Sequence, residues 1–444
     1  MKRNFVLILL AGAATGQLAV AQTIQTMGAE FQVNTLTTGA QQQPAIAANR
    51  SYGQFLVVWE SASSAGTDSD SFSLQARRLT AAAGTIATEF QVNTYTTGAQ
   101  RRPAATGAET GEFIVAWDSN GSPGSDGDGY SIQARRFNGV GAPIGDQFEI
   151  NTFTSGNQLQ ADVAISDAGR FMIVWDSAGS PGPDSDARSV QARLYDPTGS
   201  PIGDQFQVNT YSTGDQKLAA VSSDPEGNFV VVWESFGSLG TDTSATSIQG
   251  QRFDADGVQI GDEFQINTVT AGSQYRPGVA ADKQGKFMVV WGTGDVSGQV
   301  FDADGNPIGS EIQVNPLTSF IQESANVAVD DAGRFVVIWT SCGSFGSDLC
   351  FSGYSIQARH FAGDGTPVGN QFQVNTYTTN NQWEGAVAAN PQGDFVIVWQ
   401  SPGSFGSDSD SNSVDGQRVA FPILADGFND GTTDAWDGVV PLNP

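Results

Sequence analysis

The hexapeptide EFQVNT, at residues 30–35, returns in nearly the same form six more times along the chain. The later copies are EFQVNT at 89–94, QFEINT at 147–152, QFQVNT at 205–210, EFQINT at 263–268, EIQVNP at 311–316 and QFQVNT at 371–376. The first copy stands ahead of the first full repeat, and no copy follows the last one. A strand-like segment of this kind, displaced to the front, indicates a repeat architecture that closes on itself.

A tryptophan within a long apolar run marks the period of the repeat. The seven positions are Trp59, Trp117, Trp175, Trp233, Trp291, Trp339 and Trp399, with spacings of 58, 58, 58, 58, 48 and 60 residues. The second unit shows the four strand-like segments, PAATGA, EFIVAWDS, SIQARRF and QFEINT, and turn signals such as DAGR, DPEG and DADG separate such segments along the chain. No segment sustains a helical period, so the sequence predicts an all-β chain.

The character of the four segments predicts their radial order. The first is Ala-rich, as in ADVAIS, and suits a crowded axis, whereas the second, as in FVVVWES, is apolar on both faces. We therefore expect a seven-bladed β-propeller with four antiparallel strands per blade. Residues 30–35 should pair with the last third strand near 414–420 and close the ring, which an open β-solenoid or a string of sandwiches would not require.

Composition and the two termini predict an exported protein. The chain has 47 acidic and 20 basic residues, which argues against a nucleic-acid partner. Residues 1–21 read as a signal peptide, with a basic start, an apolar run too short to span a membrane, and small residues before the cleavage site. We expect a linker at 22–29, the propeller at 30–421 and an acidic tail at 422–444, without membrane insertion.

Two stretches resemble known exported bacterial proteins. The repeat DGDGYSIQARRF…GDQFEINT resembles repeats of large exported bacterial proteins, often found beside calcium-binding or adhesion modules. The tail ADGFNDGTTDAW, at 425–436, resembles a C-terminal motif of exported proteobacterial proteins. These resemblances imply a secreted, periplasmic or extracellular protein of a Gram-negative bacterium. They imply no established activity.

Two cysteines, Cys342 and Cys350, lie close together in SCGSFGSDLC. Because an oxidising compartment permits disulfides, we expect these two residues to be bonded to each other rather than free.

Acidic loops before the third strand suggest calcium, because carboxylates separated by Gly and Ser can supply the oxygen ligands of a hard cation. The alternative is a solvated Asp/Gly/Ser turn. The loops carry Asp68 and Asp70, Asp126 and Asp128, Asp184 and Asp186, and Asp408 and Asp410, and in three units an acid also follows the Trp, namely Glu60, Asp118 and Asp176.

A glutamine precedes each inner strand in all seven units, which indicates a structural role, and the two residues after it vary. The variable positions should ring the mouth of the central channel, where they would suit a glycan or peptide ligand. The alternative is an ordinary variable loop edge. The candidate ligand-binding residues are Arg101, Arg102, Lys217, Tyr275, Arg276, Trp383 and Glu384.

Catalytic signals are weak. The only histidine, His360, replaces an arginine found at this position in other units and is expected on the surface, far from the mouth. No nucleophile motif or zinc spacing is present. We expect a monomeric, non-enzymatic binding module for a glycan or a cell-surface or matrix protein, with calcium as its only cofactor. The alternatives are a polysaccharide-cleaving glycosidase or lyase, and a passive envelope component.

Overall fold

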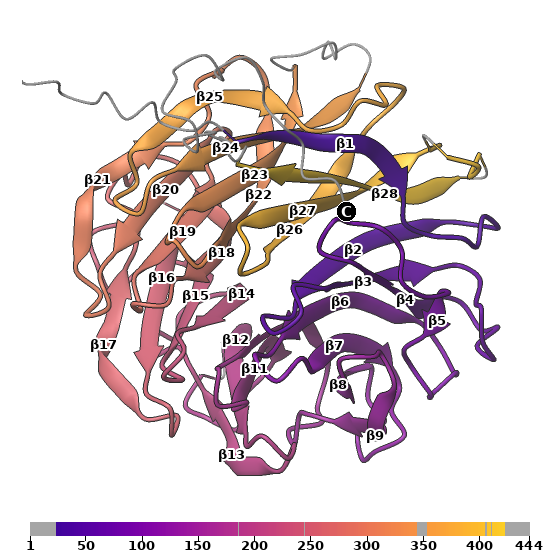
Figure 1. The fold of residues 1–444 in the computed structure, drawn as a ribbon. Helices are drawn as coiled ribbons and strands as arrows, with labels where there is room; N and C mark the ends of the chain where they lie inside the picture. The colour runs from indigo at the N-terminus through magenta and orange to yellow at the C-terminus, as the bar shows by residue number, and fades with distance from the viewer. Residues whose placement is uncertain are drawn as a thin grey trace, which may run out of the picture.

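The computed structural model describes residues 24–421, except residues 185, 244, 344–352, 405 and 410. The expected signal peptide and the acidic tail therefore lie outside the described residues. Seven four-stranded antiparallel sheets are arranged in a ring around a central axis, which confirms the predicted seven-bladed propeller (Figure 1). Among the described residues, no helix is long and apolar enough to cross a membrane.

Each blade runs from an inner to an outer strand, and the blades are numbered in the order of their inner strands. The inner strands are β2 (Gln41–Ala48), β6 (Gln100–Gly107), β10 (Gln158–Ile165), β14 (Gln216–Ser223), β18 (Tyr275–Ala281), β22 (Gln322–Val329) and β26 (Trp383–Ala389). The second strands are β3 (Phe55–Ser61), β7 (Phe113–Asn120), β11 (Phe171–Ala178), β15 (Phe229–Phe236), β19 (Phe287–Gly292), β23 (Phe335–Cys342) and β27 (Asp394–Pro402). The third strands are β4 (Ser73–Leu79), β8 (Tyr130–Phe137), β12 (Arg188–Tyr195), β16 (Thr246–Phe253), β20 (Val296–Phe301), β24 (Tyr354–Phe361) and β28 (Asn412–Ala420). The outer strands are β5 (Phe90–Gln91), β9 (Pro143–Glu149), β13 (Pro201–Gln207), β17 (Gln259–Gln265), β21 (Pro307–Gln313), β25 (Pro367–Gln373) and β1 (Gln25–Gln32).

The N-terminal strand closes the ring. β1 pairs antiparallel with β28, with Phe31 opposite Gly416 and Gln25 opposite Ala420. The predicted pairing is confirmed, but β1 begins at Gln25, inside the stretch 22–29 that was expected to be a linker.

The outer strands end earlier than the hexapeptides suggested. In blade 2 the strand ends at Glu149, and the side chain of Asn151 takes over the ladder by accepting a hydrogen bond from the amide of Ile132 at 2.8 Å. Asn34 does the same for Val414 at 2.9 Å. The repeated Asn-Thr is therefore a side-chain continuation of the sheet rather than regular strand.

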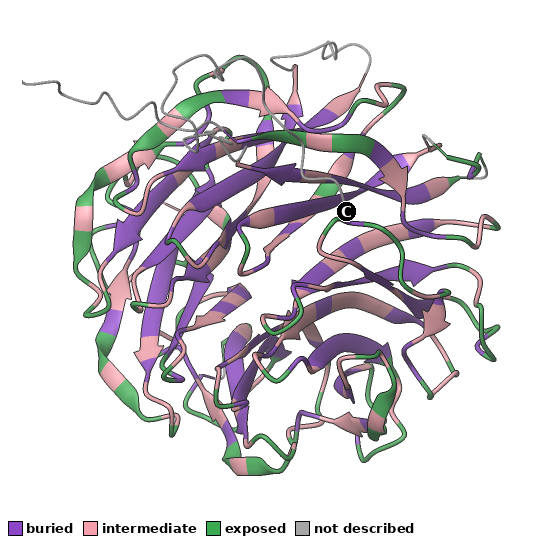
Figure 2. Ribbon diagram, in the orientation of Figure 1, coloured by how far each residue is buried: buried purple, intermediate pink, exposed green. Residues whose placement is uncertain are grey.

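The core lies between blades rather than inside one large centre. The seven repeat tryptophans are at most 1 % exposed, and the second strands are buried on both faces, as their sequences predicted (Figure 2). One core cluster, for example, joins Leu56 and Val58 of blade 1 with Phe113 and Trp117 of blade 2. Each blade is therefore stabilised by its neighbours, which is why closure matters.

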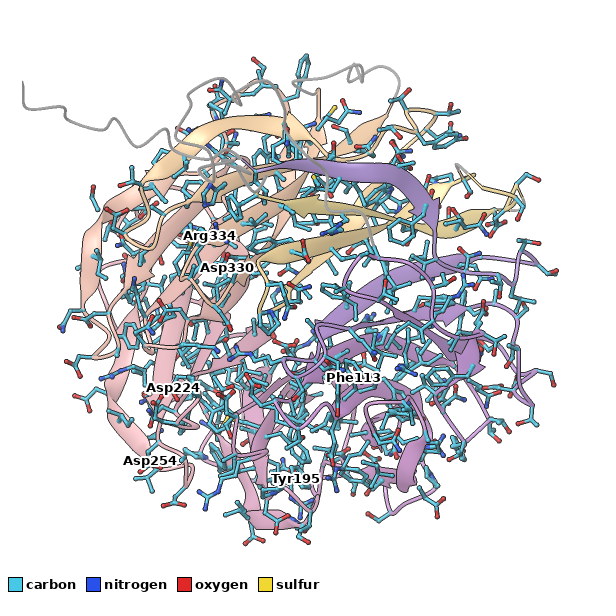
Figure 3. The ribbon with its side chains drawn as sticks, in the orientation of Figure 1. Phe113, Tyr195, Asp224, Asp254, Asp330 and Arg334 are labelled. Carbon is cyan, nitrogen blue, oxygen red and sulfur yellow. The ribbon has the colours of Figure 1, made fainter. Side chains whose placement is uncertain are left out.

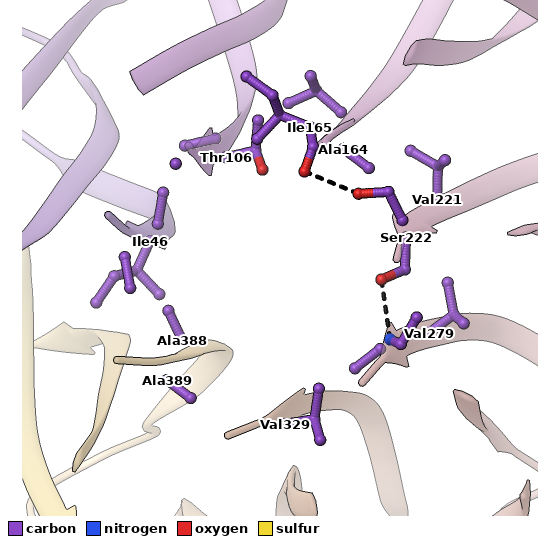
Figure 4. A pocket seen from close by; sticks show the side chains of 18 of the residues that line it. Ile46, Thr106, Ala164, Ile165, Val221, Ser222, Val279, Val329, Ala388 and Ala389 are labelled. Carbon is purple, nitrogen blue, oxygen red and sulfur yellow. Dashed lines mark hydrogen bonds between the residues drawn. The ribbon is translucent and has the colours of Figure 1, made fainter. Parts of the chain in front are cut away.

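The inner strands surround a central cavity of about 180 Å³ with mostly short side chains, such as Ala164 and Ala388 (Figure 4). The lining residues come from the C-terminal ends of these strands. Hydrogen bonds tie neighbouring inner strands together there, including Ser223 Oγ to the carbonyl of Ile165 at 2.8 Å and the amide of Ala281 to Ser222 Oγ at 3.0 Å.

Two faces result from the antiparallel order of the strands. The long-loop face carries the connections from second to third strands and from outer to next inner strands. The short-turn face carries tight turns in which an aspartate caps the backbone, as Asp254 does for the amides of Asp256 and Val258. Figure 3 labels Asp254 of blade 4, and also Asp330 and Arg334 of blade 6. Asp330 Oδ2 and Arg334 Nε lie 2.7 Å apart. These turns are structural, as expected.

Candidate functional site

The mouth of the channel on the long-loop face is formed by a backbone bulge that recurs in every blade. The residue two positions after the conserved glutamine has a left-handed backbone although it is never glycine, and the ladder between the first two strands shifts there. The residues are Gln43, Arg102, Gln160, Leu218, Arg276, Ser324 and Glu384, with φ between 48° and 60°. Such strained positions persist only where neighbouring groups hold them.

In blades 1, 2 and 4 the acid after the tryptophan holds the bulge of the next blade. Glu60 Oε1 accepts a hydrogen bond from the amide of Arg102 at 2.7 Å, and Asp118 Oδ2 accepts one from the amide of Gln160 at 3.1 Å. Glu234 of blade 4 likewise accepts from the amide of Arg276 at 3.3 Å. These carboxylates therefore connect neighbouring blades below the mouth.

Burial changes the titration of these acids. Desolvation raises the pKa of Asp118 to about 6, although the guanidinium of Arg102, 3.0 Å away, opposes the shift. Desolvation also raises the pKa of Glu60 and raises that of Asp176 well above its usual range. Asp176 is 1 % exposed, and its nearest cation, Arg188, is 3.7 Å away.

This ring of acceptors is asymmetric. Blades 1 to 4 place Glu60, Asp118, Asp176 and Glu234 after the tryptophan, whereas blades 5, 6 and 7 place Gly292, Thr340 and Gln400. Gln400 still reaches across to the amide of Gln43 at 3.2 Å.

The candidate mouth residues lie at or next to these bulges, and their side chains are engaged to different degrees. Arg101 lies over the ring of Phe72 at 4.9 Å from its centre, and Lys217 pairs with Glu234 at 3.5 Å. Arg102 forms the ion pair with Asp118.

The remaining predicted mouth residues are in blades 5 and 7. The hydroxyl of Tyr275 accepts a hydrogen bond from the amide of Gly294 at 3.0 Å, and Arg276 is exposed. Trp383 is half-buried, and Glu384 beside it is exposed.

The conserved glutamines are structural, as predicted. In blade 1, Gln41 Oε1 accepts from the indole nitrogen of Trp59 at 3.0 Å, and blade 2 repeats this contact between Gln100 and Trp117 at 2.9 Å.

The first aspartate of each acidic loop accepts a hydrogen bond from the asparagine that follows an outer strand, a contact we call the latch. Asp68 Oδ2 accepts from Asn93 Nδ2 at 2.6 Å, and its Oδ1 caps the amide of Asp70. The same aspartate–asparagine bond joins Asp126 to Asn151, Asp184 to Asn209, Asp242 to Asn267 and Asp408 to Asn34. Burial raises the pKa of Asp68, Asp126 and Asp184.

The second aspartate holds the following loop, because Asp70, Asp128 and Asp186 accept from the amides of Gly98, Gly156 and Gly214 at 2.9, 3.0 and 3.2 Å. The loop pairs are thus brought together as predicted, but Glu60, Asp118 and Asp176 point to the next blade instead of joining them. The described part of the chain contains no group of three or more His, Cys, Asp or Glu placed to hold a metal ion. Asp410 lies outside the described residues, and calcium remains a prediction.

Two further sequence expectations concern His360 and the cysteines. His360 is 3 % exposed, so the expected surface position is wrong; its ring packs edge-on against Phe421 at 4.5 Å. Desolvation, reinforced by Arg334, lowers its pKa to about 4. Cys342 ends β23, but Cys350 lies outside the described residues, so the disulfide remains a prediction.

Sequence reasoning missed a clamp near the C-terminal ends of the outer strands. Gln205 Oε1 accepts from the amide and hydroxyl of Thr152 at 2.7 and 3.0 Å and from the amide of Phe153 at 3.1 Å. Glu30 makes the same clamp with Thr376 and Tyr377 at the ring closure. The signal was the Glu or Gln that opens every hexapeptide.

Comparisons with known proteins support the fold and nothing finer. No family model matches the chain, and no curated protein matches it. A protein of unknown function from Dyadobacter fermentans has 10 % identity and a TM-score of 0.52, covering 90 % of this chain and 99 % of its own. A polysaccharide lyase has 9 % identity, a TM-score of 0.49 and coverage of 91 % and 98 %, and an α-L-arabinofuranosidase of Fusarium graminearum has 11 %, 0.45 and coverage of 88 % and 98 %. At 10 % identity, the likeness to the Dyadobacter fermentans protein shows a shared fold alone.

Proposed function

We propose that this chain is an exported, non-enzymatic binding module that recognises a glycan or a cell-surface or matrix protein at the channel mouth on its long-loop face. One observation carries the proposal. The residues that repeat around the ring are engaged in latches and clamps, whereas accessible residues that differ between blades gather at the mouth. Specific recognition needs such differences, and Arg, Tyr and Trp are the residue types that most often dominate binding energy.

The burial of the acids below the mouth favours binding over cleavage. A glycosidase needs two carboxyl groups that reach the scissile bond. Asp118 and Asp176 are at most 1 % exposed, and Asp118 holds the bulge of the next blade. In this conformation neither carboxyl group can reach a ligand in the mouth.

Binding to a glycan array and to extracellular matrix proteins, with and without calcium, tests the proposal. Trp383→Ala should weaken binding of the retained ligand by about 1–3 kcal/mol without altering the fold. Charge reversal at Asp254 or Asp302, in capped turns of the short-turn face, is the matched control and should leave binding unchanged. Loss of binding in the turn variants with retention in Trp383→Ala would place the site on the wrong face. Turnover of a polysaccharide would favour an enzyme, and no retained ligand would favour a passive envelope component.

A further inference from the structure

Blade 5 lacks the long loop that joins the second and third strands in the other blades. Its second and third strands are joined by only Thr293, Gly294 and Asp295, and its repeat is ten residues shorter, since the tryptophan spacing is 48 rather than 58. Asp295 still provides the latch, with Oδ1 2.9 Å from Asn315 Nδ2. The fold is therefore intact, and only the covering polypeptide is missing.

The missing loop uncovers residues that are packed in other blades. Tyr95 and Tyr211, which follow the hexapeptides, lie against Gly121 and Gly237 of the next blade's loop. The equivalent residue facing blade 5 is Val269, which is 53 % exposed.

Gly272, which follows Val269 in the same connection, also faces open space. A side chain at Gly98 or Gly214 would collide with Asn120 or Phe236 at the end of the next blade's second strand, whereas the space at Gly272, in front of the shorter β19, is open.

The same blade leaves an arginine without its repeat partner. Arg276 occupies the position of Arg102, whose guanidinium pairs with Asp118 at 3.0 Å. The position of Asp118 is Gly292 in blade 5, and the ring of Tyr275 fills the space where a side chain would lie. The guanidinium of Arg276 donates to Ser324 Oγ at 3.0 Å and has no carboxylate partner among the described residues.

We propose that this blade 5 gap, formed by Val269, Gly272, Tyr275, Arg276, Thr293 and Gly294, is the docking site for a polypeptide segment of the partner protein. The inference rests on the proposed function and deepens it by naming the partner as a protein. The segment supplies a carboxylate to Arg276 and an apolar side chain to Val269. In blades 1 and 2, whose loops the structure describes in full, this place is taken by the chain's own acidic polypeptide. An aliphatic valine also suits an apolar peptide side chain better than a sugar.

A random ten-residue peptide library displayed on phage tests the proposal on the full chain. We expect enrichment of peptides that combine an acidic residue with an apolar one. Binding of synthetic copies should weaken at least tenfold in Arg276→Ala, because an uncompensated carboxylate is left at the interface. Lys283→Ala, on the short-turn face of the same blade, is the control and should bind as wild type, since Lys283 pairs with Asp331 at 2.7 Å, away from the gap.

A second variant fills the gap by replacing residues 293–295 with the equivalent stretch of blade 2, residues 119–131. This graft should abolish peptide binding while leaving the melting temperature within a few degrees. Failure to enrich any acidic-apolar peptide, or equal binding to wild type and both gap variants, overturns the proposal. Binding of uronate-containing oligosaccharides that depends on Arg276, without peptide binding, overturns the choice of a protein. Ligand binding that is lost in Trp383→Ala but kept in Arg276→Ala would overturn the gap and leave the proposed function standing.

Discussion

The outer-strand clamp can be measured with a matched pair of substitutions that the chain itself provides. Gln205 and Gln371 are equivalent buried residues in blades 3 and 6, and each donates through Nε2 to a glutamine of the third strand at 3.2 Å. Gln205 Oε1 accepts the three clamp bonds, whereas Gln371 Oε1 has no partner. The reason is Pro316, which replaces the threonine of the hexapeptide and has no amide hydrogen.

The difference between Gln205→Ala and Gln371→Ala therefore isolates the clamp. Both lose the same Nε2 bond and similar buried volume, but only Gln205→Ala leaves three donors unpaired. Neutral hydrogen bonds contribute about 1 kcal/mol each, so the clamp should contribute about 2–3 kcal/mol to the free energy of unfolding. Water can replace part of this, because Thr152 is exposed on one side.

Urea denaturation followed by tryptophan fluorescence gives the measurement, since tryptophans lie in every blade core. The midpoint should fall clearly further for Gln205→Ala than for Gln371→Ala at an unchanged slope. Equal losses in the two variants, within about 0.5 kcal/mol, would refute the reasoning that these contacts hold neighbouring blades together.

Other consequences can be measured separately. Glu30→Ala removes the charged version of the clamp at the ring closure and should cost about 2–4 kcal/mol in the same denaturation assay; wild-type stability would contradict a role of β1 in closure. Because burial raises the folded pKa of Asp118 from 3.8 to about 6, the folded state binds its proton more tightly, and stability should fall as pH rises from about 4 to above 6. Asp118→Asn should flatten that slope by about 3 kcal/mol, measured by urea denaturation across the pH range; a slope equal to that of wild type would argue against the raised pKa. A Cys342–Cys350 disulfide should leave no alkylatable thiol before reduction and should contribute about 2–3 kcal/mol or less; two labelled thiols in mass spectrometry would exclude it. Calcium bound at a hundredfold excess over its dissociation constant should raise stability by about 2.7 kcal/mol; a melting temperature unaffected by EDTA and by millimolar calcium would count against the acidic loops as binding sites.

The sequence predicted the ring and its closure, because both depend on a repeated pattern. Small inner strands, doubly apolar second strands and a displaced hexapeptide can all be read from spacing alone. The roles of the acids could not be read in this way. Successive side chains of a strand point to opposite faces, so Glu60 points to blade 2 rather than to Asp68, which lies over the outer strand of its own blade.

The left-handed bulges also could not be predicted from the sequence, because no glycine marks them. Arg102 and Leu218 have φ of 49° and 54°, and an acceptor from the preceding blade faces the bulge at Arg102. Such a conformation depends on a partner about 42 residues away in the chain, as the bond from Arg102 to Glu60 shows. Local propensity cannot report it.

A residue that differs from its equivalents in the other blades therefore indicates function only after the contacts around it are known. His360 replaces an arginine, and neither ring nitrogen has a hydrogen-bond partner, but its lowered pKa keeps it neutral and Phe421 packs against it. That departure is compensated within the fold. Arg276 differs, because Gly292 removes its carboxylate and the described chain offers no replacement. The guanidinium of Arg276 is permanently charged and has no carboxylate partner among the described residues, and this directs the search for a partner to blade 5.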